Sequence, residues 1–154
     1  MPKFTYKFEK VLKIKADIED QIKQAYAFYV QKKASLLNEN EAMQSNYYEN
    51  KSDYIATLKP GDRISVADLQ SAEDYGAAVQ IRIKNNLNTV SQLDVQIEKL
   101  AKELQKATAE RKMFEKLKER AYRQYQEEQS YLDSKELDEI ASNKYYETHI
   151  KEAK

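Results

Sequence analysis

Residues 58–65 read LKPGDRIS and are the clearest interruption in a sequence that is otherwise rich in helix-forming residues. Proline disfavours helical backbone at the residue before it, Lys59, and has no N–H group to continue a helix. Gly61 can adopt the backbone angles that a reversal of the chain requires. Ser65, three residues before an aspartate, has the spacing of a capping box that starts a new helix. We therefore predict a turn at about residues 59–64 between two long helices.

The composition also favours long helices. The chain of 154 residues has only 2 Gly and 2 Pro, too few for the turns of a globular domain of this size, and 34% of its residues are charged. Such a composition is typical of extended helices. Disorder is the alternative for so polar a chain. The regular spacing of the apolar residues argues against disorder.

The segment after the turn has the apolar spacing of a coiled coil. Two interleaved series each repeat every seven residues: Ile83, Val90, Ile97 and Leu104, and Leu93, Leu100, Ala107 and Phe114. This repeat keeps one seam facing a partner helix and implies a left-handed supercoil. Gly76 costs about 1 kcal/mol relative to alanine inside a helix. We therefore expect the first turns after Ser65 to bend or to form a separate short helix.

The segment before the turn is less regular. Its apolar residues follow at steps of three and four: Phe8, Val11, Ile18, Ile22, Ala25, Tyr29, Leu36, Met43, Tyr47, Tyr54 and Leu58. Three polar residues, Lys15, Lys32 and Asn40, interrupt the same frame. The segment after the turn therefore has the cleaner repeat.

Joining the two segments makes them antiparallel neighbours, with residue i facing roughly residue 122 minus i. We therefore expect an all-α fold: a long antiparallel two-helix coiled coil, or helical hairpin, with a longer second helix. It would be a single coiled-coil domain over residues 1–154, with helix 1 at about 4–58 and helix 2 at about 65–150. About 30 residues, from near Arg123 onward, would extend beyond the N-terminus as an unpaired helix. A parallel dimer of long helices is the alternative if the break near residue 60 is only a kink.

Catalytic and metal-binding patterns are absent from the sequence. The only histidine is His149, there is no cysteine, and no Gly-rich phosphate loop or metal-ligand spacing occurs. We expect no enzyme activity, no cofactor and no metal. The start of the chain lacks the apolar run of a signal peptide, and nowhere do 18 apolar residues follow one another, so we expect a cytosolic protein without direct membrane insertion.

Charge is balanced in sum, with 26 basic and 26 acidic residues, but it is unevenly distributed. Basic residues crowd the start and the part of the second segment expected to lie beside it: Lys3, Lys7, Lys10, Lys13 and Lys15, and Arg111, Lys112, Lys116, Lys118, Arg120 and Arg123. The tail that follows is acidic. This pattern fits either a solvated helix surface or a docking site for an acidic partner. Nucleic acid is not expected as a partner, because the acidic tail would repel it.

Three stretches suggest a family. FTYKFEKVLKIKADIED at residues 4–20, ERKMFEKLKERAYRQYQEEQ at 110–129 and DSKELDEIA at 133–141 resemble the flagellar type III export protein FliJ. The resemblance covers the whole length, including the break near residue 60 and the long second helix.

This resemblance implies a coiled coil similar to the gamma subunit of rotary ATPases. Its implied partners are the hexameric flagellar export ATPase, the cytoplasmic part of the membrane export gate and the export chaperones, so that the protein would work at the cytoplasmic face of the inner membrane. The open end that enters the ATPase ring would comprise Phe4, Phe8, Val11, Leu12, Arg111, Lys112, Phe114, Lys118 and Arg120. The export-gate contact would comprise Tyr75, Val79, Arg82 and Asn86.

Two functions from different classes remain after the sequence is read. The first is a non-enzymatic stalk and regulator of the export ATPase that also escorts chaperones. The second is a stand-alone coiled-coil chaperone or scaffold that holds partners on its helix faces. The equivalent stalk of a virulence type III secretion system is a variant of the first.

Overall fold

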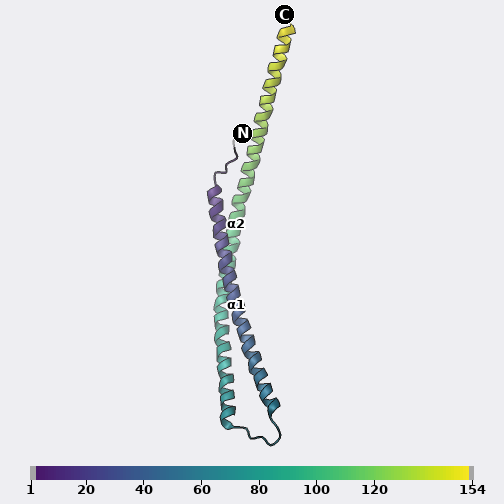
Figure 1. Ribbon diagram of the computed structural model, residues 1–154. Helices are drawn as coiled ribbons and strands as arrows, with labels where there is room; N and C mark the ends of the chain where they lie inside the picture. The colour runs from purple at the N-terminus through teal and green to yellow at the C-terminus, as the bar shows by residue number, and fades with distance from the viewer. Residues whose placement is uncertain (1–2, 153–154) are drawn as a thin grey trace. The chain divides into compact units, whose positions relative to one another are not determined.

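The computed structural model describes residues 3–152, and these form a hairpin of two helices (Figure 1). Helix α1 spans Glu9–Thr57 and helix α2 spans Val66–Glu152. No strand occurs among the described residues. The fold is all-α, with a longer second helix, as the sequence predicts. By their contacts, the residues divide into a terminal unit, Met1–Glu19 with Lys106–Lys154, and a loop unit, Asp20–Gln105. The expected single domain stays a prediction.

Helix α1 begins at Glu9 and not near residue 4, which corrects the predicted start. The preceding residues 3–8 are non-helical and end in a turn (the purple segment beside α2 in Figure 1). Phe4 and Tyr6 lie two residues apart, and both contact α2. Residues two apart share a side in extended backbone, whereas in a helix they would diverge. The contacts with α2 therefore explain why the helix starts later.

The connection between the helices is a tight turn at residues 59–62. The N–H of Asp62 donates to the carbonyl of Lys59 over 3.1 Å, and Gly61 has a φ of 91°. Proline followed by glycine at positive φ is the pattern of a type II turn. The carboxylate of Asp62 also accepts the N–H of Lys59, at 2.7 Å. Ser65 then caps α2, because its Oγ accepts the N–H of Asp68 over 3.4 Å.

Gly76 lies inside an unbroken helix, which corrects the expectation of a bend or a separate short helix. The glycine is needed for a close approach. A Cβ atom at this position would lie 2.7 Å from the hydroxyl oxygen of Tyr47, so the ring of Tyr47 packs directly on the glycine backbone. Contact with α1 offsets the low helix propensity of glycine.

The seam of α2 follows alternating steps of three and four residues over its whole paired length, which confirms the predicted repeat. It contains Val79, Ile83, Asn86, Val90, Leu93, Ile97, Leu100 and Leu104 in the loop unit, and Ala107, Arg111, Phe114, Lys118, Ala121 and Tyr125 in the terminal unit. A seam between only two helices leaves each side chain open at its flanks. Among the described apolar residues, only Val79, Val90, Leu93 and Ala107 are buried.

The seam of α1 is more polar than the sequence analysis expected. It contains Leu12, Lys15 and Glu19 in the terminal unit, and Ile22, Tyr26, Tyr29, Lys33, Leu36, Asn40, Met43 and Tyr47 in the loop unit. Ile18 and Tyr54, which the sequence assigned to the seam, are 40% and 43% exposed. Those two assignments were wrong.

Polar partners on α2 explain this outcome. In the loop unit, Lys33 pairs with Asp94 at 2.6 Å, and the side-chain amide of Asn86 donates to Oδ1 of Asn40 at 2.8 Å. The register estimated from the position of the turn places Asn40 opposite residue 82. In the structure Asn40 instead lies opposite Asn86. Burying a polar group is tolerated when a partner satisfies it. These two pairs join α1 to α2 and so help to set the register between the helices, while Nδ2 of Asn40 has no hydrogen-bond partner among the described residues.

The helix ends next to the connection leave the seam. Residues 48–57 of α1 and 66–75 of α2 are exposed throughout, and the two ribbons diverge there in Figure 1. The rings of Tyr47 and Tyr75 lie 6.2 Å apart across the two helices, and the helical residues between them and the connection are exposed. The paired part of the loop unit therefore ends at this aromatic contact.

Candidate partner-binding site in the terminal unit

An aromatic cluster joins the start of the chain to α2 in the terminal unit. The ring of Phe4 lies 5.2 Å from that of Tyr122 and 5.5 Å from that of Tyr125. Phe8 lies 6.3 Å from Phe114 in an edge-to-face arrangement. Rings at these separations attract one another beyond their simple burial. At the open end predicted from the sequence, aromatic rings of the chain start therefore pack against aromatic rings of α2.

Ion pairs cross the same unit and engage two of the cations that the sequence proposed for partner contact. Arg111 bonds to Glu19, which is only 4% exposed, and also to Glu115 at 2.7 Å. Lys118 bonds to Glu9 of α1 at 2.8 Å. Arg111, whose side chain is 23% exposed, thus points toward the interior of the hairpin, while the side chain of Lys118 stays 40% exposed. A third pair, between Lys15 and Glu110, measures 2.9 Å.

Two of these side chains have pKa values that their partners shift toward the charged form. The hydrogen bond from Lys15, and then its positive charge, hold the pKa of Glu110 below its ordinary value. Hydrogen bonds to Glu19 and to Glu115 raise the pKa of Arg111. Both shifts favour the charged form, so Glu110 and Arg111 carry charge at neutral pH.

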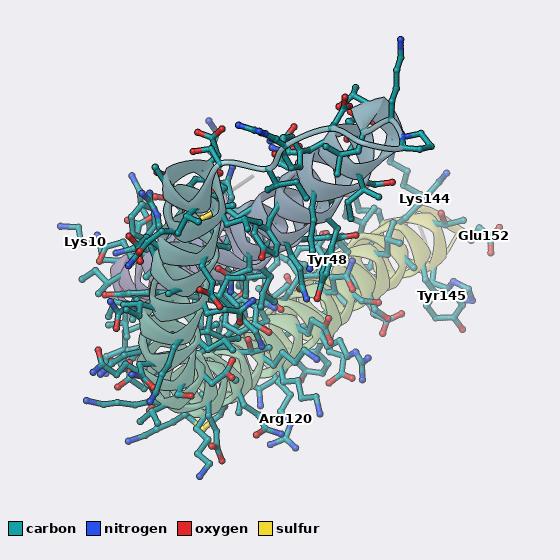
Figure 2. The ribbon with its side chains drawn as sticks, turned by 90° about the horizontal axis from the view of Figure 1, so that it is seen from below. Lys10, Tyr48, Arg120, Lys144, Tyr145 and Glu152 are labelled. Carbon is teal, nitrogen blue, oxygen red and sulfur yellow. The ribbon has the colours of Figure 1, made fainter. Side chains whose placement is uncertain are left out.

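Other cations of the terminal unit face outward. Lys10 and Arg120 project away from the ribbon in Figure 2, and Lys112 is also exposed. None of the three forms an ion pair within residues 3–152. Val11 and Leu12 are half-buried. Of the residues predicted to contact the ATPase ring, Lys112 and Arg120 therefore offer positive charge that no ion pair within residues 3–152 engages. The aromatic residues of the same set hold the unit together.

A groove runs along α2 beside the non-helical start of the chain. Its first part is a hollow of about 530 Å³ between residues 3–8 and the stretch of α2 from Leu117 to Glu128. Its second part, of about 610 Å³, is lined by Gln124, Glu127, Glu128, Tyr131 and Leu132. Both parts are open to solvent and carry charged rims. Such a groove suits a side chain or a helix of a partner protein better than a small metabolite.

Comparison with protein families gives this arrangement its context. A family model described as "Flagellar FliJ protein" matches residues 4–149. The chain belongs to the FliJ family. A search of curated proteins and a search of solved structures found no match. Family membership makes the chain a coiled-coil protein associated with flagellar export, in a family of non-enzymatic export components.

The four residues proposed for gate contact in this FliJ-family chain lie in the loop unit, and they differ in exposure. Val79 is 6% exposed and belongs to the seam, and Asn86 is held by Asn40. Tyr75 is 52% exposed, and Arg82 reaches outward to pair with Glu39 at 2.6 Å. A partner could therefore touch Tyr75 and Arg82 directly. Val79 and Asn86 would act only by holding the helices in place.

The last part of α2 lies outside the seam of the FliJ-family hairpin. Every described residue from Ser130 to Glu152 is exposed. Figure 1 shows this part continuing past the start of the chain, and Figure 2 shows Tyr145 and Glu152 projecting from it. The paired region reaches Tyr125, through Phe4. The exposed tail begins a few residues later than the predicted position near Arg123.

Residues 3–152 contain neither a metal-binding cluster nor a membrane span. No cluster of three or more His, Asp or Glu side chains there could hold a metal ion. No helix in that range is long and apolar enough to cross a membrane. In the terminal unit, the groove and the outward cations are features that could bind a partner.

Sequence reasoning missed two side chains of the terminal unit. Tyr6 donates its hydroxyl to the carbonyl of Phe114 over 3.2 Å, and Glu19 is buried against Arg111. A signal for Glu19 was present. Counting back from Tyr47 in steps of four and three places Glu19 in the seam. No comparable pattern marks Tyr6, because it lies before the helix.

Proposed function

We propose that this chain is the non-enzymatic central stalk and regulator of the flagellar export ATPase. In this role it also escorts export chaperones and contacts the cytoplasmic part of the export gate. It acts in the cytoplasm and, within the export apparatus, peripherally at the cytoplasmic face of the inner membrane. Family membership over residues 4–149 is the observation that carries the proposal.

The terminal unit supports the ATPase-facing part of this proposal. Phe4 and Phe8 fix the start of the chain against α2, while Lys112 and Arg120 keep exposed positive charge on the outside of the same unit. A preorganised end with outward cations can enter a ring and meet acidic groups there, because little ordering is needed on binding. The nine predicted contact residues remain a proposal.

The test measures ATP hydrolysis by the hexameric export ATPase with and without this protein at saturating ratios. We expect the wild-type chain to stimulate assembly or hydrolysis. A variant with Lys112→Glu and Arg120→Glu should bind roughly tenfold more weakly, because reversed rim charges repel an acidic partner. Arg111 and Lys118 are unsuitable for this test, since their loss would break ion pairs with Glu19 and Glu9.

The matched control is Lys84→Glu with Lys99→Glu, two exposed positions on the same helix but in the loop unit. This control has the same change in net charge and should stimulate the ATPase as the wild type does. Equal ATPase activity with and without the wild-type protein would contradict the stalk proposal. An equal loss of ATPase stimulation in both variants would mean that net charge, and not the terminal unit, determines the effect.

A stand-alone chaperone or scaffold is the alternative, and exposed tyrosines favour it. Tyr48, Tyr131, Tyr145 and Tyr146 are each more than half exposed. A chaperone that binds through these rings should tolerate charge reversal at Lys112 and Arg120. Replacement of Tyr145 and Tyr146 by serine separates the two ideas, since it should affect client binding only. Whether the partner ATPase is flagellar or belongs to a virulence system is decided by which of the two co-purifies from native lysate.

A further inference from the structure

The two hollows on α2 form one continuous groove. They share Gln124 and Glu128, so the hollow beside the start of the chain leads into the one further along the helix. At about 1.5 Å per residue, the stretch from Leu117 to Leu132 is about 22 Å long. This length equals about four turns of a partner helix.

The second hollow has the spacing of a coiled-coil acceptor site. Four of its lining residues, Gln124, Glu127, Glu128 and Tyr131, stand at i, i+3, i+4 and i+7. In a coiled coil, four residues with this spacing make the hole that receives one side chain of the facing helix. Helix α1 does not reach this level, because it begins at Glu9, and the ring contacts of the described residues before it reach Tyr125. The hole thus suits a helix from another chain.

Charge changes sign along the groove. Lys3, Lys7 and Arg120 line its first part, and the second part is lined by the paired acids Glu127 and Glu128. A helix that lies in the groove must therefore be acidic at one end and basic at the other. Its basic end must fall on the two glutamates.

The chain itself contains such a helix. Basic residues of α2 precede the glutamates, at Arg120 and Arg123, and both are exposed. A second α2 lying antiparallel, with the two-fold axis near residue 125, places each basic half against the acidic half of the other copy. A two-fold axis doubles every favourable contact, since the same patch serves both partners.

We propose that the groove on α2 binds the same stretch of α2 from a second copy of this chain, in antiparallel orientation. Arg120 and Arg123 of each copy face Glu127 and Glu128 of the other. Met113, Leu117 and Tyr131, which are 52%, 38% and 67% exposed, supply apolar contact along the same side. This inference goes beyond the proposed stalk function and does not depend on it.

Sedimentation equilibrium of the full chain tests the proposal. We expect the weight-average mass to rise with concentration from 18.1 kDa toward twice that value, and the rise to weaken as salt is added. The interface is polar, so association should fall in the micromolar range, roughly 1–100 μM. A mass that stays at 18.1 kDa up to several hundred micromolar in low salt would overturn the proposal.

Charge-swapped variants test the orientation. Variant B carries Arg120→Glu and Arg123→Glu, and variant A carries Glu127→Lys and Glu128→Lys. Each alone should associate at least roughly tenfold more weakly than the wild type, because like charges then meet across the axis. An equimolar mixture of A and B should recover association as a heterodimer. Failure of the mixture to recover would overturn the antiparallel pairing.

Two measurements keep the result interpretable. Far-ultraviolet circular dichroism should show equal helix content in the wild type and both variants, and Lys84→Glu with Lys99→Glu should self-associate like the wild type.

Because the chain has no cysteine, Gln124→Cys gives a single thiol next to the proposed axis. It should form an intermolecular disulfide readily, while the exposed Gln96→Cys should not. Equal cross-linking at both positions, or association that ignores variants A and B, would show that the copies meet through another surface.

Discussion

Gly76 shows how one residue is explained by its neighbour across the helix pair. A methyl group there would overlap the ring of Tyr47, so the helix-stabilising effect of alanine competes with a steric conflict. We predict that Gly76→Ala raises the free energy of unfolding by about 1 kcal/mol when Tyr47 is also replaced by alanine. With Tyr47 present, the same substitution should give less than this or should destabilise the protein. Urea unfolding of the four variants measures the difference, and an equal effect in both backgrounds would contradict the close contact.

Glu110 gives a residue-level prediction about pH. Its pKa lies below the ordinary value of 4.5 in the folded chain, first because Lys15 donates a hydrogen bond to it. A carboxyl group with a lowered pKa stabilises the fold above its unfolded pKa, and this contribution is lost as the pH falls through the folded pKa. Lys15→Met should therefore lower the free energy of unfolding near pH 7 and have a smaller effect below about pH 4.

Thermal unfolding of the wild type and of Lys15→Met across this pH range gives the measurement. Lys13→Met is the control, since Lys13 is exposed and has no ion pair in the part of the chain that the structure describes. A difference between the wild type and Lys15→Met that stays constant from neutral to acidic pH would mean that the pair with Glu110 contributes nothing.

At the scale of the elements, the Asn40–Asn86 pair connects the two helices of the loop unit but leaves one buried amide nitrogen without a hydrogen bond. Nδ2 of Asn40 is buried and has no hydrogen-bond partner among the described residues. Asn86→Leu alone should lower the free energy of unfolding by about 1–3 kcal/mol, because it leaves Asn40 wholly unsatisfied. Replacing both by leucine should instead raise it by about 1–2 kcal/mol. Chemical denaturation measures the free energy of unfolding of both variants. A lower value for the double variant as well as for the single one would contradict the role assigned to the pair.

The exposed tail is an element that the seam does not support. Residues 130–152 are exposed throughout, so their removal takes no side chain from the seam. A chain that ends after Gln129 should lose helical ellipticity roughly in proportion to its length but keep its melting midpoint within about 2 °C. A large fall in the midpoint would show that the tail packs against the hairpin in solution.

At the scale of the whole molecule, one surface has two proposed uses. Arg120 belongs both to the predicted ATPase contact and to the groove proposed for a second copy. The two partners should therefore compete if both proposals hold. Adding the export ATPase to the Gln124→Cys variant under oxidising conditions should slow the formation of its disulfide. An unchanged rate at saturating ATPase would separate the two surfaces.

Most of the architecture could be predicted from the sequence. The turn follows from Pro60 and Gly61, which act on their own backbone, and the seam of α2 follows from a seven-residue repeat that depends only on spacing. The aromatic and basic composition of the terminal unit was likewise visible, because it follows from which residues lie opposite one another in a hairpin. The family match over residues 4–149 agrees with the resemblance in sequence.

Tertiary structure decided the features that depend on a partner across the hairpin. Glu19 and Lys33 lie in the seam because Arg111 and Asp94 satisfy them there, and no property of α1 alone reveals those partners. Arg111 points inward for the same reason and Lys118 is held by Glu9, which leaves Lys112 and Arg120 as outward cations without an ion pair among the described residues. Local sequence thus determined that LKPGDRIS reverses the chain and where the apolar stripe of α2 lies. Which charges are buried and which remain exposed for binding is a pairwise property, and only the folded hairpin could decide it.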